Sequence, residues 1–403
     1  MKVLYIHQYF VTPAEPGGTR SYWIARELVR RGHSVTMITS TRARHPEPGR
    51  EHIDGIDVVY VKNPIYNNEL SALAKVKSFV SFIGSAVKAA AKEKDVDIVF
   101  ATSTPLTVGA IAMRLKKMKK WKYVFEVRDL WPEFPIEIGA IRNKLAIKVL
   151  RRFEKRIYDR AEHVVALSPG MKRGVMDAGT PEEKVSMIPN MAKPDKFFPH
   201  EPDMDIVKQF GIDLDKFNVI HFGSMGRANG LPYIVEAAKE LRDRGDDSIH
   251  FLFLGSGATE APLKRQVEEL GLTNVSFHGN HKMDVVSEVV NCCDASITTF
   301  LNLPVLQTNS PNKLFDSLSA GKPIIVNSAG WTKDLVEREH CGFFVDPTAP
   351  ADLADKLLLY KDKADELKTM GENARRLSLE VYDKDILSAQ VADVLERFGQ
   401  AKA

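Results

Sequence analysis

The most informative stretch of the chain is Thr308-Asn309-Ser310-Pro311-Asn312-Lys313-Leu314-Phe315-Asp316, which continues through Ser319-Ala320-Gly321-Lys322-Pro323 into Ile324-Ile325-Val326. It predicts a polar loop, a helix and a buried strand, because Pro311 suits a first helical turn and Gly321 ends a helix. Such a helix start leaves backbone N–H groups free at the positive end of a helix dipole, which suits a diphosphate. Seen alone, the stretch is better explained as an ordinary helix start in an α/β domain, so its interpretation depends on the rest of the chain.

Several groups of this stretch have the chemistry of a nucleotide site. The N–H groups expected to be free are those of Asn312, Lys313 and Leu314, with Asn309 and Ser310 in the loop before them. Lys313 places a cation among these donors. Asp316 follows about one helical turn later, where a carboxylate accepts hydrogen bonds from the paired hydroxyls of a ribose.

Short apolar runs alternate with helical patterns along the whole chain, which is typical of parallel α/β sheets. The strands expected in the first half are Val3–Ile6, Val35–Thr39, Val58–Val61, Ile98–Thr102, Tyr123–Val127, Val164–Leu167 and Val185–Ile188. Those expected in the second half are Val219–Phe222, Phe251–Leu254, Val275–His278, Ala295–Thr299, Ile324–Asn327 and Gly342–Val345. The pattern predicts two doubly wound domains, and ligands bind at the carboxyl ends of strands in such sheets.

A proline-rich segment, Pro194–Asp205, has the composition of a linker between these domains. The boundary is therefore predicted near residue 200, with domains at 1–199 and 200–383 that face a central cleft. The chain ends in a helical pattern, and the helix at about 384–403 is expected to pack back onto the first domain.

Length and composition exclude several classes of protein. With 403 residues, 44% hydrophobic and 27% charged, the chain is globular and long enough for two domains. No apolar run approaches the ~20 residues of a membrane helix, and the start has no signal-peptide layout. The cysteines Cys292, Cys293 and Cys341 form neither a disulfide framework nor a metal-ligand spacing. A cytoplasmic protein without a bound metal or cofactor is expected.

The net charge of +3 hides a division between the halves. Residues 1–200 carry 34 Lys and Arg against 21 Asp and Glu, a net charge of +13, while residues 201–403 carry 22 against 32, a net charge of −10. This asymmetry points to an anionic partner for the first half. Within that half, Leu73–Ala90 places Leu73, Val76, Phe79, Val80, Ile83, Val87 and Ala90 on one helical stripe. The stripe is either a core-packed face or a surface that lies on a membrane.

Glycine-rich loops follow strands in both halves. Gly17-Gly18 precedes the helical pattern Trp23–Arg31 but has neither the GxGxxG nor the P-loop spacing. In the second half, Gly223-Ser224 leads to Arg227, and Gly255-Ser256-Gly257 follows the next strand. Glycines let a ligand approach the backbone closely, and Arg227 is suited to a phosphate. Each loop alone is a weak signal, but the series predicts a nucleotide site.

Functional groups are dense after the fifth expected strand, in Glu126-Val127-Arg128-Asp129-Leu130-Trp131-Pro132-Glu133. One interpretation is a binding site in which Trp131 gives an apolar platform for a sugar ring or a lipid chain. The other is structural, with an Arg128–Asp129 or Glu126–Arg128 ion pair and a packed tryptophan. The residues alone leave the two interpretations about equal.

Together, Gly17-Gly18, Arg31-Gly32-His33-Ser34-Val35, Gly226-Arg227-Ala228-Asn229-Gly230 and Ser310–Pro323 resemble the retaining glycosyltransferases of family 4. The resemblance covers nearly the whole chain and implies the two-domain GT-B fold. The passages Arg128–Glu133 and Ser310–Asp316 look most like bacterial members that build surface polysaccharides.

This resemblance implies a sugar transfer from a nucleotide-diphosphate donor, UDP-linked by family expectation. The sugar is expected to be an amino or deoxy hexose, and the acceptor a polyprenyl-diphosphate-linked or other saccharide. Donor contacts are expected from Gly17, Gly18, Gly223, Ser224, Arg227, Gly255, Ser256, Gly257, Asn309, Ser310, Asn312, Lys313, Leu314 and Asp316. Acceptor contacts are expected from Arg20, Arg128 and Trp131, and catalytic roles for Asp129, Arg227 and Lys313. The basic first half implies attachment to the anionic inner face of the plasma membrane.

The chain departs from the family pattern at three places. The two-glutamate motif falls on Thr308 and Asp316, which puts the identity of the sugar in doubt. Asn229 stands where a lysine is usual, so Arg227 and Lys313 must neutralise the diphosphate. Arg128-Asp129 stands where many relatives carry a histidine, which leaves the catalytic base open.

Three alternatives to a transferase stay open on sequence grounds. A non-hydrolysing UDP-sugar 2-epimerase has the same fold but needs no basic acceptor domain. A catalytically inactive, donor-binding partner subunit would explain Thr308 and Asn229. A nucleic-acid-binding protein is disfavoured, because the lysines are not interleaved with aromatic residues and no recognised module is present.

Overall fold

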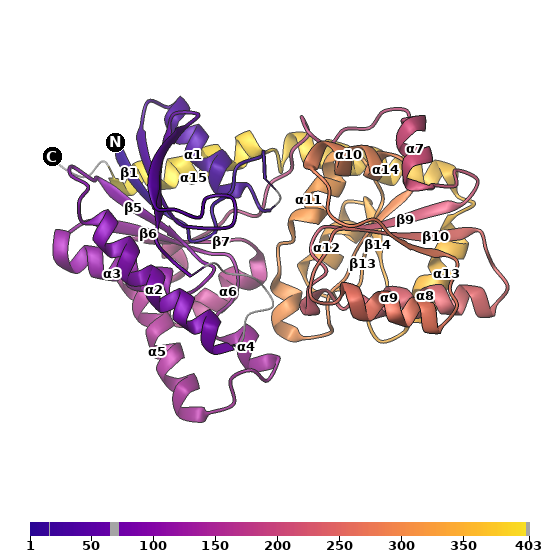
Figure 1. Cartoon of the computed structure of the whole chain (residues 1–403), viewed down its shortest axis with the longest axis horizontal. Coiled ribbons are helices and arrows are strands. Elements are labelled where there is room, and N and C mark those ends of the chain that lie inside the picture. Colours follow the sequence, from indigo (N-terminus) through magenta and orange to yellow (C-terminus); the bar gives the residue numbers. More distant parts are fainter. Residues whose placement is uncertain (16, 65–71, 400–403) are drawn as a thin grey trace. The chain divides into compact units, whose positions relative to one another are not determined.

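A computed structural model of the chain describes residues 1–15, 17–64 and 72–399. The chain divides into two compact units, Met1–Pro189 together with the segment from Lys384 onward, and Asn190–Asp383. Each unit is an α/β domain built on a largely parallel sheet (Figure 1). The predicted pair of doubly wound domains is therefore confirmed.

The boundary between the units falls before the prolines that suggested a linker. Arg375 Nη1 donates to the carbonyl of Phe197 (2.9 Å), and Arg375 Nη2 donates to that of Pro194 (3.1 Å). These bonds fasten residues 190–199 to the second unit, so the prediction that they belong to the first domain was wrong.

The first unit holds an eight-stranded sheet of order β3-β4-β2-β1-β5-β6-β7-β8. Its strands are β1 (Lys2–Ile6), β2 (Ser34–Ser40), β3 (Gly49–Ile53), β4 (Ile56–Val61), β5 (Ile98–Thr102), β6 (Lys122–Val127), β7 (His163–Ala166) and β8 (Val185–Met187). Its helices are α1 (Arg20–Arg30), α2 (Ala72–Ala90), α3 (Val108–Lys119), α4 (Glu133–Glu137), α5 (Lys144–Arg160), α6 (Pro169–Asp177), η1 (Glu182–Lys184) and α15 (Lys384–Gly399). The strand order reverses between β1 and β5, which is the point where ligands bind in such sheets.

The second unit holds a parallel six-stranded sheet of order β11-β10-β9-β12-β13-β14. Its strands are β9 (Phe217–Phe222), β10 (Ile249–Leu254), β11 (Val275–Phe277), β12 (Ala295–Thr298), β13 (Ile324–Val326) and β14 (Gly342–Phe344). Its helices are α7 (Met204–Phe210), η2 (Arg227–Asn229), α8 (Pro232–Asp243), α9 (Glu260–Glu269), α10 (Met283–Asn291), η3 (Pro304–Thr308), α11 (Asn312–Ser319), α12 (Trp331–Arg338), α13 (Pro350–Tyr360) and α14 (Ala364–Glu380). Here the order reverses between β9 and β12.

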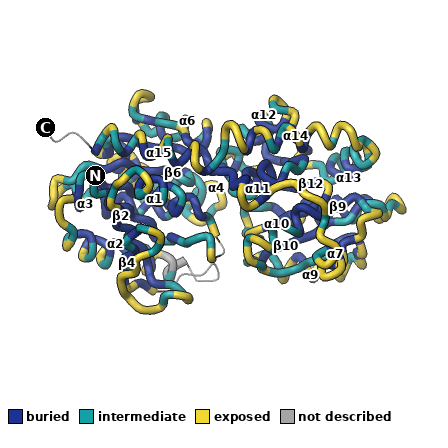
Figure 2. Tube along the Cα trace, turned by 90° about the horizontal axis from the view of Figure 1, so that it is seen from above, coloured by how far each residue is buried: buried dark blue, intermediate teal, exposed yellow. Residues whose placement is uncertain are grey.

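Most strands are buried on both faces, as Figure 2 shows in dark blue. Parallel strands covered by helices on both sides read as continuous apolar runs, which is why the sequence located them. The exception is β3, which pairs antiparallel with β4 and is mostly exposed. Its residues are polar, and no apolar run marks it.

Helix α2 does not bury the stripe that the sequence predicted. Val76 and Val80 are 56% and 60% exposed, whereas Phe82, Ala86 and Ala90 are fully buried. The stripe is therefore neither wholly packed in the core nor wholly exposed, because the buried face of the helix runs through Ser78, Phe82, Ala86 and Ala90. The side chain of Leu73 lies outside the described residues.

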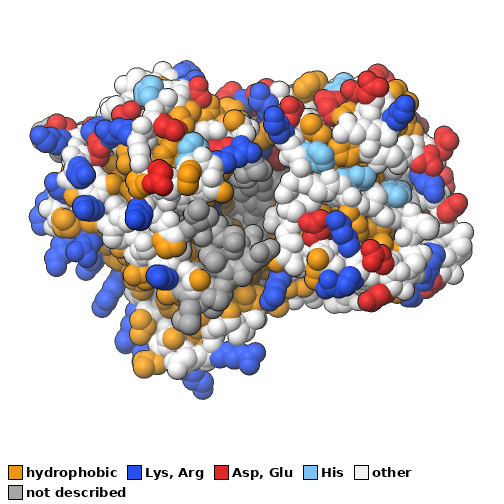
Figure 3. Space-filling view, in the orientation of Figure 1, with side chains coloured by type: hydrophobic (Ala, Val, Ile, Leu, Met, Phe, Trp, Pro, Cys, Tyr) orange, Lys and Arg blue, Asp and Glu red, His pale blue; other side chains and the backbone are white. Residues whose placement is uncertain are grey.

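Helix α5 presents a second exposed apolar pair beside basic residues. Leu145 and Val149, one turn apart, are 70% and 54% exposed. The buried residues of this helix, Glu154, Ile157 and Tyr158, all lie in its second half. On the face of the first unit shown in Figure 3, Lys and Arg side chains outnumber acidic ones.

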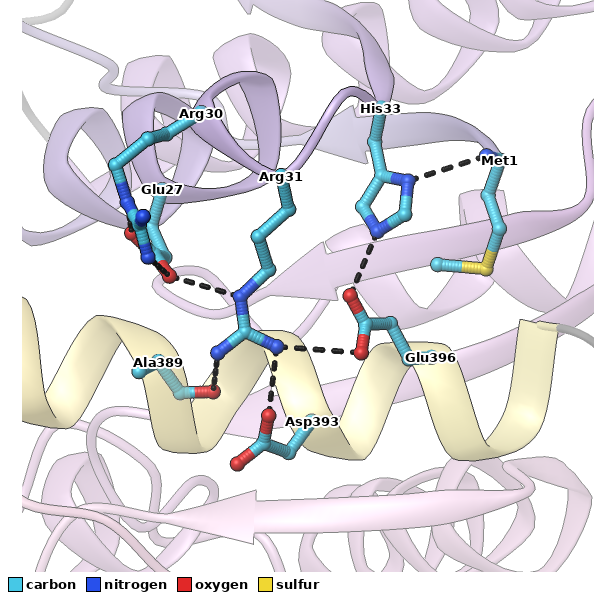
Figure 4. Close-up of polar contacts among 8 residues, drawn as sticks. All are labelled: Met1, Glu27, Arg30, Arg31, His33, Ala389, Asp393 and Glu396. Carbon is cyan, nitrogen blue, oxygen red and sulfur yellow. Dashed lines mark hydrogen bonds and ion pairs between the residues drawn. The ribbon is translucent and has the colours of Figure 1, made fainter.

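The last helix, α15, packs against α1 through a polar cluster (Figure 4). Arg31 pairs with Asp393 (2.6 Å) and Glu396 (3.2 Å) of α15 and with Glu27 of α1 (2.8 Å). The Nε2 atom of His33 lies 2.7 Å from Glu396 Oε1. This cluster gives the Arg31–Val35 passage a structural role, since it fastens the end of the chain to the first unit.

Candidate active site

The two glycine loops of the second unit lie against each other. Gly223 N donates to the carbonyl of Leu254, and Met225 N donates to that of Ser256 (2.8 Å each). A Cβ atom on Gly255 would come within 1.9 Å of the Gly223 carbonyl oxygen, and one on Gly257 within 2.5 Å of the Met225 oxygen. Packing between the loops therefore already requires Gly255 and Gly257, whether or not a ligand approaches them.

Arg227 lies on η2, just beyond the first of these loops, and is exposed. Asn229, on the same turn, donates from its amide to the carbonyl of Ser224, and its own carbonyl accepts from Thr299 Oγ1 (2.7 Å). Asn229 thus holds the loop in shape. Arg227 makes no ion pair with any described residue, which leaves its guanidinium available to an anion.

Helix α11 begins one residue later than predicted. Pro311 is the residue before the helix, with φ −76° and ψ 132°, and Leu314 N donates to its carbonyl (3.1 Å). The expectation that the Leu314 N–H is free was wrong, and its side chain is fully buried in the core. The N–H groups of Asn312 and Lys313 have no partner among the described residues, so two donors remain.

The loop before α11 is fastened within the second unit. Ser310 Oγ accepts from Asn190 N (3.2 Å), and the Ser310 carbonyl accepts from the Asn190 amide. The carbonyl of Asn309 accepts from Trp331 Nε1 (2.6 Å). These bonds fix where the helix starts. They also occupy part of the hydrogen-bonding capacity of Asn309 and Ser310 that the sequence analysis assigned to the nucleotide-sugar donor.

Lys313 points to a partner that the sequence did not suggest. Its Nζ atom lies 3.0 Å from Nε2 of His221, a buried residue of β9. Burial lowers the pKa of Lys313 to about 7. Burial, together with the nearby Lys313, also holds the pKa of His221 well below its usual range. Near neutral pH the lysine is therefore only partly charged until an anion arrives.

Asp316 is 8% exposed and pairs with Lys193, whose Nζ atom lies 2.7 Å from Oδ1. Burial raises the pKa of Asp316, and Lys193 opposes that shift. Lys193 is itself buried, directly before the segment that resembled a linker. The pair holds the carboxylate on the second turn of α11.

In the first unit, Arg20 is buried and serves the interior of the domain. Its Nε atom donates to Glu126 Oε1 (2.9 Å), and its other nitrogens donate to the carbonyls of Ile188 and Pro189. Glu126 also accepts from Thr102 Oγ1. The expected acceptor contact of Arg20 and the suggested Glu126–Arg128 pair were both wrong, because a buried guanidinium takes the nearest buried carboxylate.

The other predicted residues of the first unit either follow β6, as Arg128, Asp129 and Trp131 do, or lie directly before α1, as Gly17 and Gly18 do. Arg128 N donates to Ser103 Oγ (3.0 Å), and Asp129 Oδ2 accepts from Thr104 Oγ1 (2.9 Å). Burial raises the pKa of Asp129. Gly17 is exposed and adopts φ +136°, and Trp131 is partly exposed. Gly18 is also partly exposed.

Five residues with site chemistry escaped the sequence analysis: His221 and Lys193 in the second unit, and His7, Gln8 and Arg42 in the first. The only signal for His221 was a lone polar residue in an apolar run. Within the described part of the chain, no group of three or more His, Cys, Asp or Glu residues is placed to hold a metal ion. None of the described helices is long and apolar enough to cross a membrane.

Two family descriptions match this chain, one on each unit. Residues 17–191 match "Glycosyl transferase 4-like domain", and residues 203–377 match "Glycosyl transferases group 1". The chain belongs to the group 1 glycosyltransferases, family 4. A glycosyltransferase of this family uses a nucleotide-sugar donor, and the exposed arginine and free N–H groups of the second unit suit its diphosphate.

Relatives of this glycosyltransferase share its length and its fold. "Probable glycosyltransferase WbjE" of Pseudomonas aeruginosa is 23% identical over 351 residues, 85% of each chain. Sucrose-phosphate synthase from Thermosynechococcus elongatus superposes with a TM-score of 0.80 over 100% of both chains, at 17% identity. HepE from Anabaena, solved in complex with UDP and glucose, superposes with a TM-score of 0.74 over 98% of this chain and 100% of that one, at 18% identity. These likenesses establish the GT-B fold.

Proposed function

We propose that this glycosyltransferase moves a hexose, an amino or deoxy sugar, from UDP to a lipid-linked saccharide during surface polysaccharide synthesis, with retention at the anomeric carbon. The observation that carries the proposal is the start of α11, where two free N–H groups, the Lys313 side chain and a nearby loop with Arg227 offer positive charge. Support for UDP comes from the complex of HepE with UDP and glucose. Support for the pathway comes from relatives named for colanic acid and teichuronic acid biosynthesis.

The reaction needs a diphosphate to leave, and charge develops on it as its bond to the sugar breaks. Donors and cations placed at that position lower the barrier, because their attraction grows as the negative charge grows. Arg227, Lys313 and the N–H groups of Asn312 and Lys313 supply this stabilisation without a metal ion. The carboxylate of Asp316 accepts hydrogen bonds from the ribose hydroxyls, with Lys193 favouring its charged form.

Retention follows from displacement on one face of the sugar. The bond between C1 and the phosphate oxygen breaks, and the acceptor oxygen bonds to C1 on the same side. The proton of the acceptor hydroxyl passes to the departing phosphate. In this scheme Asp129 and Arg128 position the acceptor, and Trp131 offers it an apolar surface.

Peripheral attachment to the cytoplasmic face of the membrane is part of the proposal. The first half carries a net charge of +13, and α5 exposes Leu145 and Val149 among basic residues. Each basic residue near an anionic surface adds ~1 kcal/mol. Leu145 and Val149 would add the favourable free energy of burying their exposed apolar side chains in the membrane.

The test is a thermal-shift screen of nucleotide diphosphates and their sugars with the full chain. A ligand at 100 times its Kd stabilises the protein by about 2.7 kcal/mol. UDP is expected to raise the melting temperature of wild type, and Lys313→Met to lose most of that rise. Lys368→Met, a change of an exposed lysine in the same unit, serves as the control. Equal shifts in wild type and Lys313→Met would reject the site.

Product analysis separates the alternatives. An epimerase would convert the UDP-sugar without any acceptor, and an inactive partner subunit would bind UDP without turnover. Transfer to acceptor, or slow hydrolysis of the donor, is expected here.

A further inference from the structure

The carboxyl edge of the first sheet holds buried polar atoms without partners. His7 and Gln8 follow β1 and are 4% and 1% exposed, and Arg42 follows β2. His7 Nδ1, both polar atoms of the Gln8 amide, and Arg42 Nε and Nη1 have no hydrogen-bond partner among the residues that the structure describes. Ser40 donates twice to the Gln8 carbonyl (3.2 Å and 2.8 Å), which places the ends of these strands together.

Such atoms are costly to leave unpaired. A buried donor or acceptor without a partner costs about 1–3 kcal/mol, and more when it is charged. Native proteins pair nearly all of their buried polar groups, so a cluster of exceptions needs an explanation. This cluster lies where the strand order reverses between β1 and β5, the place at which doubly wound sheets bind ligands.

The charge of the cluster selects the class of ligand. Arg128 Nη1 lies 3.4 Å from His7 Nε2, and the charges of Arg128 and Arg42 both add to the burial that lowers the His7 pKa. Arg128 therefore contacts His7 directly, and Arg42 lies near enough to act on it through its charge. Among the described residues, Glu15 accepts from Arg42 Nη2 (2.6 Å), and Arg42 Nε and Nη1 stay unpaired. Burial raises the pKa of Asp129, and the hydrogen bond from Thr104 and the charge of Arg128 oppose that shift.

We propose that His7, Gln8, Arg42 and Arg128 form a binding site for a phosphate group carried by the acceptor, an inference that rests on the proposed transferase function. Guanidinium groups from two loops and an amide N–H approach the site from different strands, which suits the several oxygens of a tetrahedral phosphate. The side-chain oxygen of Gln8, Oε1, then accepts from a hydroxyl of the attached sugar. A sugar joined to a lipid diphosphate supplies both groups.

The experiment uses the full chain saturated with UDP, so that the donor site is filled. Inorganic pyrophosphate and geranyl diphosphate are titrated separately by calorimetry. Both are expected to bind, and Arg42→Gln is expected to weaken both about tenfold or more, the effect of one charge-assisted hydrogen bond. The matched control is Arg44→Gln, which removes the same charge from an exposed neighbour and should change affinity less than twofold.

Gln8→Leu separates a binding role from a packing role. The amide is unpaired in the free protein, so its replacement by a similar apolar side chain should keep or raise the melting temperature while weakening pyrophosphate binding. A lower melting temperature with unchanged affinity would show that Gln8 serves packing, with ordered water as its partner, and would overturn the inference.

Other outcomes are equally decisive. Equal losses in Arg42→Gln and Arg44→Gln would mean diffuse attraction rather than a site. Binding of geranyl diphosphate without pyrophosphate would put the affinity in the lipid chain, which also contradicts the inference. UDP binding is measured first in the same series. Its absence rejects the proposed donor site but leaves the comparison of Arg42→Gln with Arg44→Gln readable.

Discussion

Lys313 Nζ lies 3.0 Å from His221 Nε2, so the lysine at the start of α11 rests against a neutral imidazole instead of a carboxylate. Burial lowers the pKa of Lys313 to about 7, against an ordinary value of about 10.4. A bound diphosphate would favour the charged amine and raise that pKa again. If Lys313 binds the donor as proposed, donor binding is coupled to proton uptake.

The first prediction is a pH dependence of UDP affinity. Above about pH 7 the free protein must take up a proton to bind, so the association constant should fall with rising pH, by at most about tenfold per unit. Calorimetry between pH 7.5 and 9.5, in buffers of different ionisation enthalpy, measures both the affinity and the protons taken up. Lys313→Met should bind weakly with a flat profile. A flat profile in wild type would contradict the assignment.

The second prediction concerns Asp316 and the ribose. If the carboxylate accepts from ribose hydroxyls, wild type should bind UDP more tightly than 2′-deoxy-UDP, by about tenfold to a hundredfold for a hydrogen bond of about 1.5–3 kcal/mol to a charged group. Asp316→Asn should lose most of that preference, as measured by competition binding. Lys193→Met removes the partner that opposes protonation of Asp316. It should weaken the binding of UDP more than the binding of pyrophosphate. An unchanged preference in Asp316→Asn would place the ribose elsewhere.

The strands show how much of the fold could be predicted from the sequence. Every predicted strand is present, because parallel strands buried on both faces form apolar runs that local pattern detects. The strand β3 escaped detection because its pairing with β4 depends on a turn at Asp54-Gly55 and leaves polar residues exposed. The prolines after residue 193 suggested a linker, but a distant arginine, Arg375, fastens that segment to the second unit.

The site divides in the same way. Loops that follow strands can be located from the spacing of the apolar runs, so the sequence predicted Arg227, Lys313 and Asp316 as site residues. Their partners could not be found, since His221 and Lys193 lie far away along the chain and meet them only in the folded sheet. The mistaken role of Arg20 has the same origin, because Glu126 is 106 residues away. Local pattern identifies a charged residue but does not reveal which buried group it pairs with.

The third prediction tests the structural role of the Arg20–Glu126 pair. Both side chains are almost fully buried, and removing one partner of a buried ion pair costs about 3–5 kcal/mol. Arg20→Met should lower the melting temperature of the first unit by several degrees, while UDP binding to the second unit persists. Arg26→Met, on the exposed side of the same helix, should change stability far less. A stable Arg20→Met protein with lost transferase activity would restore the acceptor role.

The fourth prediction concerns the membrane attachment proposed for α5. Leu145 and Val149 stand one turn apart on the exposed first half of this helix, beside Lys144, Lys148 and Arg152. Burying a large aliphatic side chain contributes about 1.5–3 kcal/mol, so Leu145→Glu with Val149→Glu should weaken vesicle binding at least tenfold. Sedimentation with vesicles containing phosphatidylglycerol measures this, and binding should weaken with added salt, because charge contributes. Leu359→Glu, a change of a similarly exposed leucine on α13 of the second unit, is the control. The helix offers both a basic and an apolar contribution, and each must be measurable. Wild-type binding to uncharged vesicles as tight as to anionic ones, or a loss of binding in Leu359→Glu as large as in the α5 variant, would therefore rule out α5 as the attachment site.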